Sequence, residues 1–278
     1  MRNRMLPLCS LVLVGCGGGA TLGGAPPEIV YAVPAGGPLT YDRSDTLSIA
    51  IEAPGMGSIT VHVGQLMTLG MIFASSGGET LVTTSIERLT AGLTNPIYGP
   101  ITLTEADVQG DMVVRLDGRG RAEVIETPTV ADVGGLVFNA TTLAYELLPK
   151  LPPPGTRTGG TWVDTTTYFG EDGPASIEMT WIGTSRLVGD TLVDGRSLSL
   201  IRTDAEVTIE VSGTLSGMQA SQSMAGPETG FYLWDRFRGV MVAYEFERDL
   251  TGSSKISALP TALPLRAKQR RFMWLVGG

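Results

Sequence analysis

The feature that most constrains the fold of this sequence is an alternation of apolar and polar residues with a period of two. Six stretches show it: 47–51, 59–63, 112–116, 177–181, 207–211 and 240–246. Because successive side chains of a β-strand point to opposite faces, each stretch predicts a strand with one buried face. Val, Ile and Thr, which strands favour, are frequent in and around these stretches. We therefore predict an all-β fold.

Turn signals separate these stretches. They are PGMG (54–57), SSGGE (75–79), DGRG (117–120), GEDG (170–173) and VDGR (193–196). Gly and Asp tolerate the backbone conformations that tight turns need. Strands joined in this way, with almost no helical pattern between them, indicate curved antiparallel sheets and not βαβ units.

One segment departs from the strand pattern. Residues 139–148 (NATTLAYELL) begin with a capping residue and place Leu143, Leu147 and Leu148 on one side, and Pro149 then ends the pattern. We predict a short helix there. Two arrangements stay open: two curved lobes joined by the helix, or one large sheet that holds the helix in its concavity. We favour an N-terminal β lobe at 28–135, a helix and Pro-rich linker at 136–154, and a C-terminal β lobe at 155–278.

The first 16 residues resemble the signal of a bacterial lipoprotein. Arg2 and Arg4 precede an apolar run, 5–14, that is too short to span a membrane as a helix. Leu13-Val14-Gly15-Cys16 resembles a lipobox. This resemblance implies cleavage between Gly15 and Cys16, fatty chains such as palmitate on Cys16, and a Gly/Pro-rich tether over 16–27. An ordinary signal peptide or an uncleaved anchor is the alternative.

The lipoprotein resemblance also implies a location. Gly17, not Asp, follows the cysteine, so the expected place in a host with two membranes is the periplasmic face of the outer membrane. Loss of residues 1–15 removes two arginines and changes the formal charge from −8 to −10. An acidic body of this kind makes nucleic acid an unlikely partner. We interpret the basic residues at 266, 268, 270 and 271 as the solvated flank of a last strand.

Three further stretches bear a looser resemblance. They are PPPGTRTGGTWVDTTTYF (152–169), residues 39–63 and residues 110–126. Together they resemble an uncharacterised bacterial lipoprotein family in which a G-x-T-W strand follows a proline-rich linker. Such proteins are built from curved antiparallel sheets, similar to the half-barrels of lipoprotein-carrier proteins of the LolA/LolB type. This resemblance implies a fold and assigns no reaction.

The sequence offers little catalytic or metal-binding chemistry. His62 is the only histidine, and we interpret it as a surface residue of a strand. After processing no free cysteine remains, so zinc sites with nitrogen and sulfur ligands are excluded. We interpret Asp42, Asp45, Glu171 and Asp172 as solvated turn residues and not as calcium ligands. No catalytic residue, metal site, ligand-binding residue or cofactor is assigned.

The leading hypothesis for function is a non-enzymatic, lipid-anchored envelope protein. A curved sheet would bind an apolar or amphipathic ligand, or an envelope partner, on its concave side. The first alternative is a scaffold lipoprotein that acts through protein–protein contact at a sheet edge or face. The second is a hydrolase with a carboxylate pair, which would require one carboxyl group with a strongly raised pKa in an open cleft.

Overall fold

We describe the protein from a computed structural model. The described residues are 27–278, apart from 54, 56, 96–98, 131–139, 173–174 and 216–217. Within them, no helix is long and apolar enough to cross a membrane. The predicted signal, Cys16 and most of the tether lie outside the described residues.

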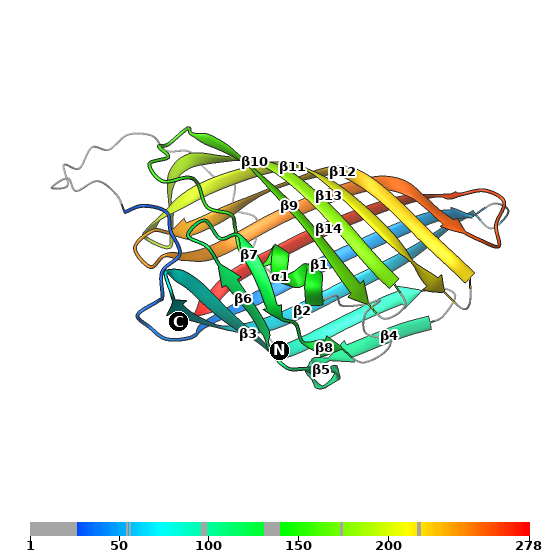
Figure 1. The fold of residues 1–278 in the computed structure, drawn as a ribbon, viewed down its shortest axis with the longest axis horizontal. Helices are drawn as coiled ribbons and strands as arrows, with labels where there is room; N and C mark the ends of the chain where they lie inside the picture. Colours follow the sequence, from blue (N-terminus) through cyan, green and yellow to red (C-terminus); the bar gives the residue numbers. More distant parts are fainter. Residues whose placement is uncertain are drawn as a thin grey trace.

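The all-β prediction is confirmed, because nearly all regular structure belongs to one curled antiparallel sheet (Figure 1). Its twelve strands are β1 (Leu39–Ala53), β2 (Gly57–Ser76), β3 (Glu79–Asn95), β4 (Gly99–Thr104), β6 (Met112–Leu116), β7 (Ala122–Glu126), β9 (Thr161–Asp172), β10 (Ala175–Val193), β11 (Arg196–Leu215), β12 (Met218–Asp235), β13 (Val240–Ile256) and β14 (Leu263–Gly277). A two-stranded sheet consists of β5 (Val108–Gln109) and β8 (Thr129–Val130). One 3-10 turn, η1, spans Glu105–Asp107.

The sheet runs without a break through both halves of the chain. Its order is β7-β6-β3-β2-β1-β14-β13-β12-β11-β10-β9, with β4 also paired to β3. The join between the halves is the antiparallel pair of β1 and β14, which runs from Thr40 opposite Gly277 to Ile51 opposite Leu265. The strand pairing therefore follows the single-sheet arrangement and not two separate lobes. Once these strands pair, the inward side chains of both halves share one concavity and contribute to one core cluster.

The predicted helix forms as α1 (Ala140–Glu146) and lies inside the concavity (Figure 1). Leu143 and Leu147 are almost fully buried, and they pack in a cluster with inward side chains of the sheet. The ring of Tyr145 stacks on Tyr168 of β9, with centroids 4.8 Å apart. Asn139, the proposed cap, lies outside the described residues. The helix thus fills part of the half-barrel instead of joining two lobes.

The two ends of the half-barrel can be distinguished by the turns that each end carries. Asp194 and Gly195 both have positive φ, 49° and 77°, which suits the two-residue turn between β10 and β11. The turns at 77–78 and 236–239 lie at the same end as 194–195, as does the C-terminus (Figure 1). We call this the proximal end. The opposite end, which carries the turn at 257–262, is the distal end.

Candidate functional site

Six charged side chains are packed together on the concave face. Three are arginines and three are carboxylates, so their formal charges balance. We call this set the interior ion cluster: Arg43, Asp45, Glu146, Glu228, Arg248 and Arg271. Every member except Glu146 is less than 9% exposed as a whole residue, and the side chain of Glu146 is 9% exposed.

Glu146 connects the helix to three strands. Its carboxylate accepts from Arg271 Nη1 at 2.8 Å, from Arg43 Nη2 at 3.3 Å and from Arg248 Nη2 at 3.4 Å. These arginines come from β14, β1 and β13, which are neighbours in the sheet. The helix is therefore held in the concavity by ionic contacts as well as by its leucines.

Glu228 of β12 binds the other side of the cluster. It accepts from Arg248 Nε at 2.7 Å, from Trp181 Nε1 at 3.0 Å and from Arg271. Two neutral groups complete the arrangement. The Tyr244 hydroxyl accepts from Arg43 Nε at 2.9 Å, and the side-chain amide of Gln269 donates to Asp45 Oδ1 at 3.0 Å.

The arginines set the protonation state of two carboxylates of the cluster, Glu146 and Glu228. Burial tends to raise the pKa of Glu146 and Glu228, but Arg271 and Arg248 outweigh burial and lower the pKa of both groups. A general acid of a hydrolase needs the opposite shift. The pair therefore suits a structural role, and it gives the carboxylate-pair hydrolase hypothesis no support.

The lowered pKa values predict acid sensitivity. A carboxylate with a folded-state pKa below its unfolded value stabilises the fold above the unfolded pKa, about 4.5, and this contribution is lost as the pH falls through the folded pKa. We expect the free energy of unfolding to fall steeply below about pH 4.5. Urea titrations at several pH values would measure it. Glu228→Gln should show a shallower acid slope than the parent, and an equal slope would contradict the assignment.

The concave side has little free space. Two cavities inside the half-barrel that are lined by described residues measure about 40 Å³ and about 80 Å³. A hollow of about 860 Å³ lies at the proximal end, between residues 27–30, the turn at 117–119 and the Pro-rich stretch 152–158. The larger of the two interior cavities is lined mainly by apolar side chains of β1 and β11–β14, including Ile49, Met224 and Leu250. In the smaller one, Lys150 lies 4.8 Å from the centroid of the Trp181 ring, and burial lowers the pKa of Lys150 to about 8. Small-ligand sites typically enclose several hundred cubic ångströms.

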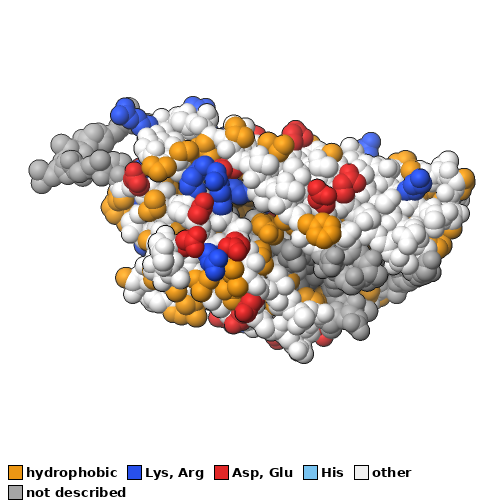
Figure 2. Space-filling model, viewed as in Figure 1, with side chains coloured by type: hydrophobic (Ala, Val, Ile, Leu, Met, Phe, Trp, Pro, Cys, Tyr) orange, Lys and Arg blue, Asp and Glu red, His pale blue; other side chains and the backbone are white. Residues whose placement is uncertain are grey.

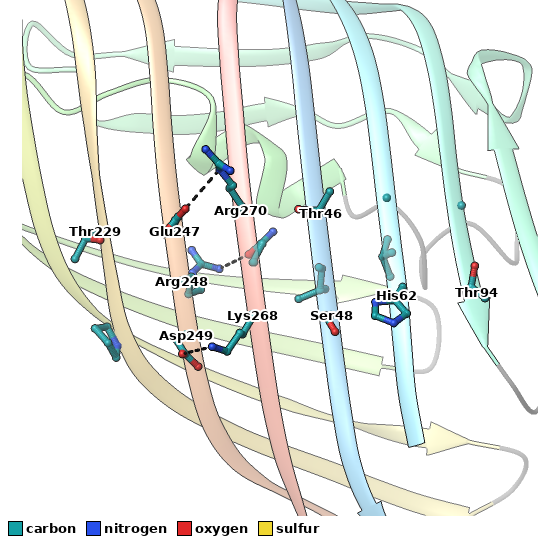
Figure 3. A pocket seen from close by; sticks show the side chains of 16 residues that line it. Thr46, Ser48, His62, Thr94, Thr229, Glu247, Arg248, Asp249, Lys268 and Arg270 are labelled. Carbon is teal, nitrogen blue, oxygen red and sulfur yellow. Dashed lines mark hydrogen bonds and ion pairs between the residues drawn. The ribbon is translucent and has the colours of Figure 1, made fainter. Parts of the chain in front are cut away.

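A larger space lies on the convex face. We call it the outer hollow; its volume is about 840 Å³ and it crosses β12, β13, β14, β1, β2 and β3 (Figure 3). The strand register builds it from two rows of outward side chains. One row is Thr229, Glu247, Arg270, Thr46, Gly64 and Gly92; the other is Asp249, Lys268, Ser48, His62 and Thr94.

Each row has a charged half and an uncharged half. On β13 and β14, Lys268 Nζ lies 3.1 Å from Asp249 Oδ2, and Arg270 Nε lies 3.5 Å from Glu247 Oε1. On β1 to β3 the rows carry hydroxyl groups, one imidazole and the paired glycines Gly64 and Gly92. A Cβ at Gly64 would meet nothing within 4 Å. The two glycines thus leave a gap in the side-chain cover of the outer face.

Comparison with known proteins gives no family assignment. No family model matches the sequence, and no curated protein matches it. Three solved structures resemble the fold only distantly. DynF from the dynemicin biosynthesis pathway of Micromonospora chersina is 10% identical, covers 92% of each chain and has a TM-score of 0.28. An outer membrane channel from Pseudomonas putida F1 is 9% identical, covers 88% of this chain and 97% of that one, and has a TM-score of 0.34.

The third is the beta domain of the Bordetella autotransporter BrkA, which is 10% identical over 86% of this chain and 99% of that one, with a TM-score of 0.22. One of the three is thus an outer membrane channel, and another is a domain of an autotransporter. TM-scores this low do not establish a common fold, and the assignment of a site to this chain rests on its own residues.

The structure confirms some sequence-based interpretations and corrects others. His62 is exposed on β2, on the face opposite Val63, as predicted. Arg271 is only 4% exposed, so the expectation of a solvated flank is wrong for this residue, although it is confirmed for its neighbour Arg270. Asp42 and Asp45 are not turn residues, because both lie within β1 and Asp45 is buried.

The sequence contained a signal for the interior ion cluster that we did not interpret. Arg43 is two residues from Tyr41, and Arg271 is two residues from Met273, so each arginine shares the inward phase of a buried apolar residue. A charged residue in the apolar phase of a strand indicates a buried, paired charge. Within the described residues, no group of three or more His, Cys, Asp or Glu could hold a metal ion. Gly15 and Cys16 lie outside the described residues.

Proposed function

We propose that this protein is a lipid-anchored envelope protein that binds a polar segment of a protein partner in the outer hollow. The lipobox-like sequence at 13–16 supports the anchor and the envelope location. The single observation that supports the binding mode is the distribution of space. A hollow of about 840 Å³ opens across six strands of the polar convex face, while the two cavities described within the concavity measure about 40 Å³ and 80 Å³. The other large hollow, of about 860 Å³, lies at the proximal end and not in the concavity of the sheet.

This distribution favours the partner-binding alternative over a carrier of apolar ligands. A lipid chain would need a continuous apolar cavity of a few hundred cubic ångströms. In the described part of the concavity, α1 and the interior ion cluster occupy the central space. Removing them to admit a ligand would expose six charges that now neutralise each other, at a high cost in free energy.

The chemistry of the hollow indicates a polar occupant. Thr46, Ser48 and Thr94 offer hydroxyl groups, and His62 offers an imidazole. The ion pairs of β13 and β14 lie beside them with both signs of charge. No Trp, Tyr or Phe is among the described lining residues, so the stacking platform common in carbohydrate sites is missing from this part. A protein segment that carries hydrogen-bonding side chains and charged side chains of both signs fits this lining best.

Site-specific photo-crosslinking in cells would test this proposal. A benzophenone amino acid at Ser48 lies inside the hollow, and the same probe at Thr208 lies on the outer face of β11, outside it. We expect one discrete, stoichiometric protein adduct from position 48 and none from position 208. Gly64→Tyr should abolish the adduct, because the new tyrosine side chain would have open space at this position and would fill the hollow.

Two outcomes would contradict the proposal. One is the absence of a protein adduct at position 48 together with co-purifying lipid, which would favour the carrier. The other is an adduct from a probe at Thr167. This residue lies on β9, which pairs only with β10 among the described strands and forms an edge of the sheet. Binding there would indicate addition of a partner strand to the edge.

A further inference from the structure

The proximal end of the half-barrel carries the two most exposed large hydrophobic side chains of the described residues. Phe237, in the turn between β12 and β13, is 80% exposed, and Leu192, beside the turn between β10 and β11, is 76% exposed. Val33 and Val276 add further exposed apolar surface at this end. Figure 2 shows hydrophobic side chains over this end, at the left, with both basic and acidic side chains among them. Isolated exposed apolar residues are common, but a group at one end can mark an interaction surface.

The turn that presents Phe237 is rigidly built. The Asp235 carboxylate accepts from the backbone N–H of Phe237 at 3.0 Å and of Arg238 at 3.1 Å. Gly239 closes the turn with a φ of +67°, and its N–H donates to the Asp235 carbonyl at 2.8 Å. Arg236 and Arg238 flank Phe237 in the sequence, but the Arg236 side chain is only 14% exposed, because its guanidinium pairs with Asp190. An exposed aromatic ring on a turn held in this way suits a membrane interface, where the ring can enter the apolar layer.

The chain that leads to Cys16 leaves the body beside this turn. The N–H of Ala32 donates to the Gly239 carbonyl at 3.2 Å. One residue earlier, the Tyr31 hydroxyl donates to the Pro149 carbonyl at 2.7 Å, and its ring meets Trp234 edge to face. Residues 31 and 32 are thus fixed beside this turn, a few residues after the described part of the chain begins.

The length of that chain limits which surface can meet the membrane. The eleven residue steps from Cys16 to Pro27 extend at most about 40 Å, and a flexible glycine-rich chain of this length spans about 20 Å on average. The longest strands have 20 residues, and such strands extend over about 65 Å. A lipid group on Cys16 therefore holds the proximal end close to the bilayer, and the distal end lies beyond the average reach of the chain.

We propose that the proximal end docks on the lipid surface, with the side chains of Phe237 and Leu192 inserted at the interface. This inference rests on the proposed lipidation of Cys16. It assigns an orientation: the half-barrel stands on its proximal end and the outer hollow faces the aqueous compartment. Asp190 and Asp194 lie among the arginines of this end, so we expect docking to depend on apolar contact and to change little with anionic lipid.

A single environment-sensitive label would test the docking. The mature lipoprotein has no other free thiol once Cys9 is removed and Cys16 is acylated. Phe237→Cys can therefore be labelled specifically with a nitrobenzoxadiazole dye and reconstituted in vesicles of phosphatidylethanolamine and phosphatidylglycerol. The matched control is Ser257→Cys, in the exposed turn at the distal end. We expect a several-fold rise and a blue shift of emission, with quenching by nitroxide-labelled lipid, at position 237 only.

The readouts separate this inference from the proposed function. An intact mass without added acyl chains would refute the lipidation itself. A lipidated protein whose label at 237 is as solvent-exposed and as weakly quenched as the label at 257 would refute the docking while leaving the anchor intact. Equal quenching at both positions would also refute it, because the half-barrel would then lie on its side.

Discussion

Replacing Arg271 with methionine should lower the free energy of unfolding by about 3–5 kcal/mol, because it leaves buried carboxylates without a full set of counter-charges. Arg271 contacts both Glu146 and Glu228, and its side chain is 5% exposed. Methionine keeps most of the apolar stem, so the loss reports mainly on the charge. Urea unfolding followed by tryptophan fluorescence would measure the change.

The neighbouring arginine provides the control. Arg270 points to the opposite face of β14, where it pairs with Glu245 and Glu247 and its side chain is 54% exposed. Exposed ion pairs contribute about 0–1 kcal/mol, so Arg270→Met should lower stability by less than about 1 kcal/mol. Equal losses in the two variants would show that the interior ion cluster is not a main source of stability.

Replacing Cys16 with serine should abolish membrane association almost completely. The serine hydroxyl cannot carry the thioether-linked lipid, and without two or more acyl chains a protein is not stably anchored. The variant should also keep its signal segment. Residues 13–16 resemble a lipobox, and in lipoproteins with a lipobox the lipid is attached before the signal is cleaved. Membrane fractionation and intact-mass measurement would show both effects.

The second cysteine gives a matched comparison. Cys9 lies in the apolar run of the predicted signal and outside the lipobox-like sequence. Cys9→Ser should therefore mature to normal size, carry acyl chains and stay with the membrane. A Cys16→Ser protein that matures normally and remains in the membrane fraction as firmly as the parent would show that the anchor has another origin.

Much of the fold could be predicted from the sequence because it depends on local periodicity. In 112–116, Met112, Val114 and Leu116 are all buried, as the period of two requires. The turn at Asp194-Gly195 and the helix that ends before Pro149 follow equally local rules. The lengths of the strands could not be predicted as well, because polar residues on the outer face and arginines in inward positions interrupt the alternation of apolar and polar residues.

Six of the twelve strands of the main sheet, several turns and the helix could be located from local sequence, together with the buried face of those six strands, because neighbouring residues set these properties. Strand pairing and the contacts between charges depend on residues far apart in the chain and became visible only in the folded protein. Gln269 hydrogen-bonds Asp45 across 224 positions, and Arg43 contacts Glu146 across 103. Both the interior ion cluster and the outer hollow take their residues from strands distant in sequence. Their composition depends on the pairing of β1 with β14 and on strand register, and no local pattern encodes either.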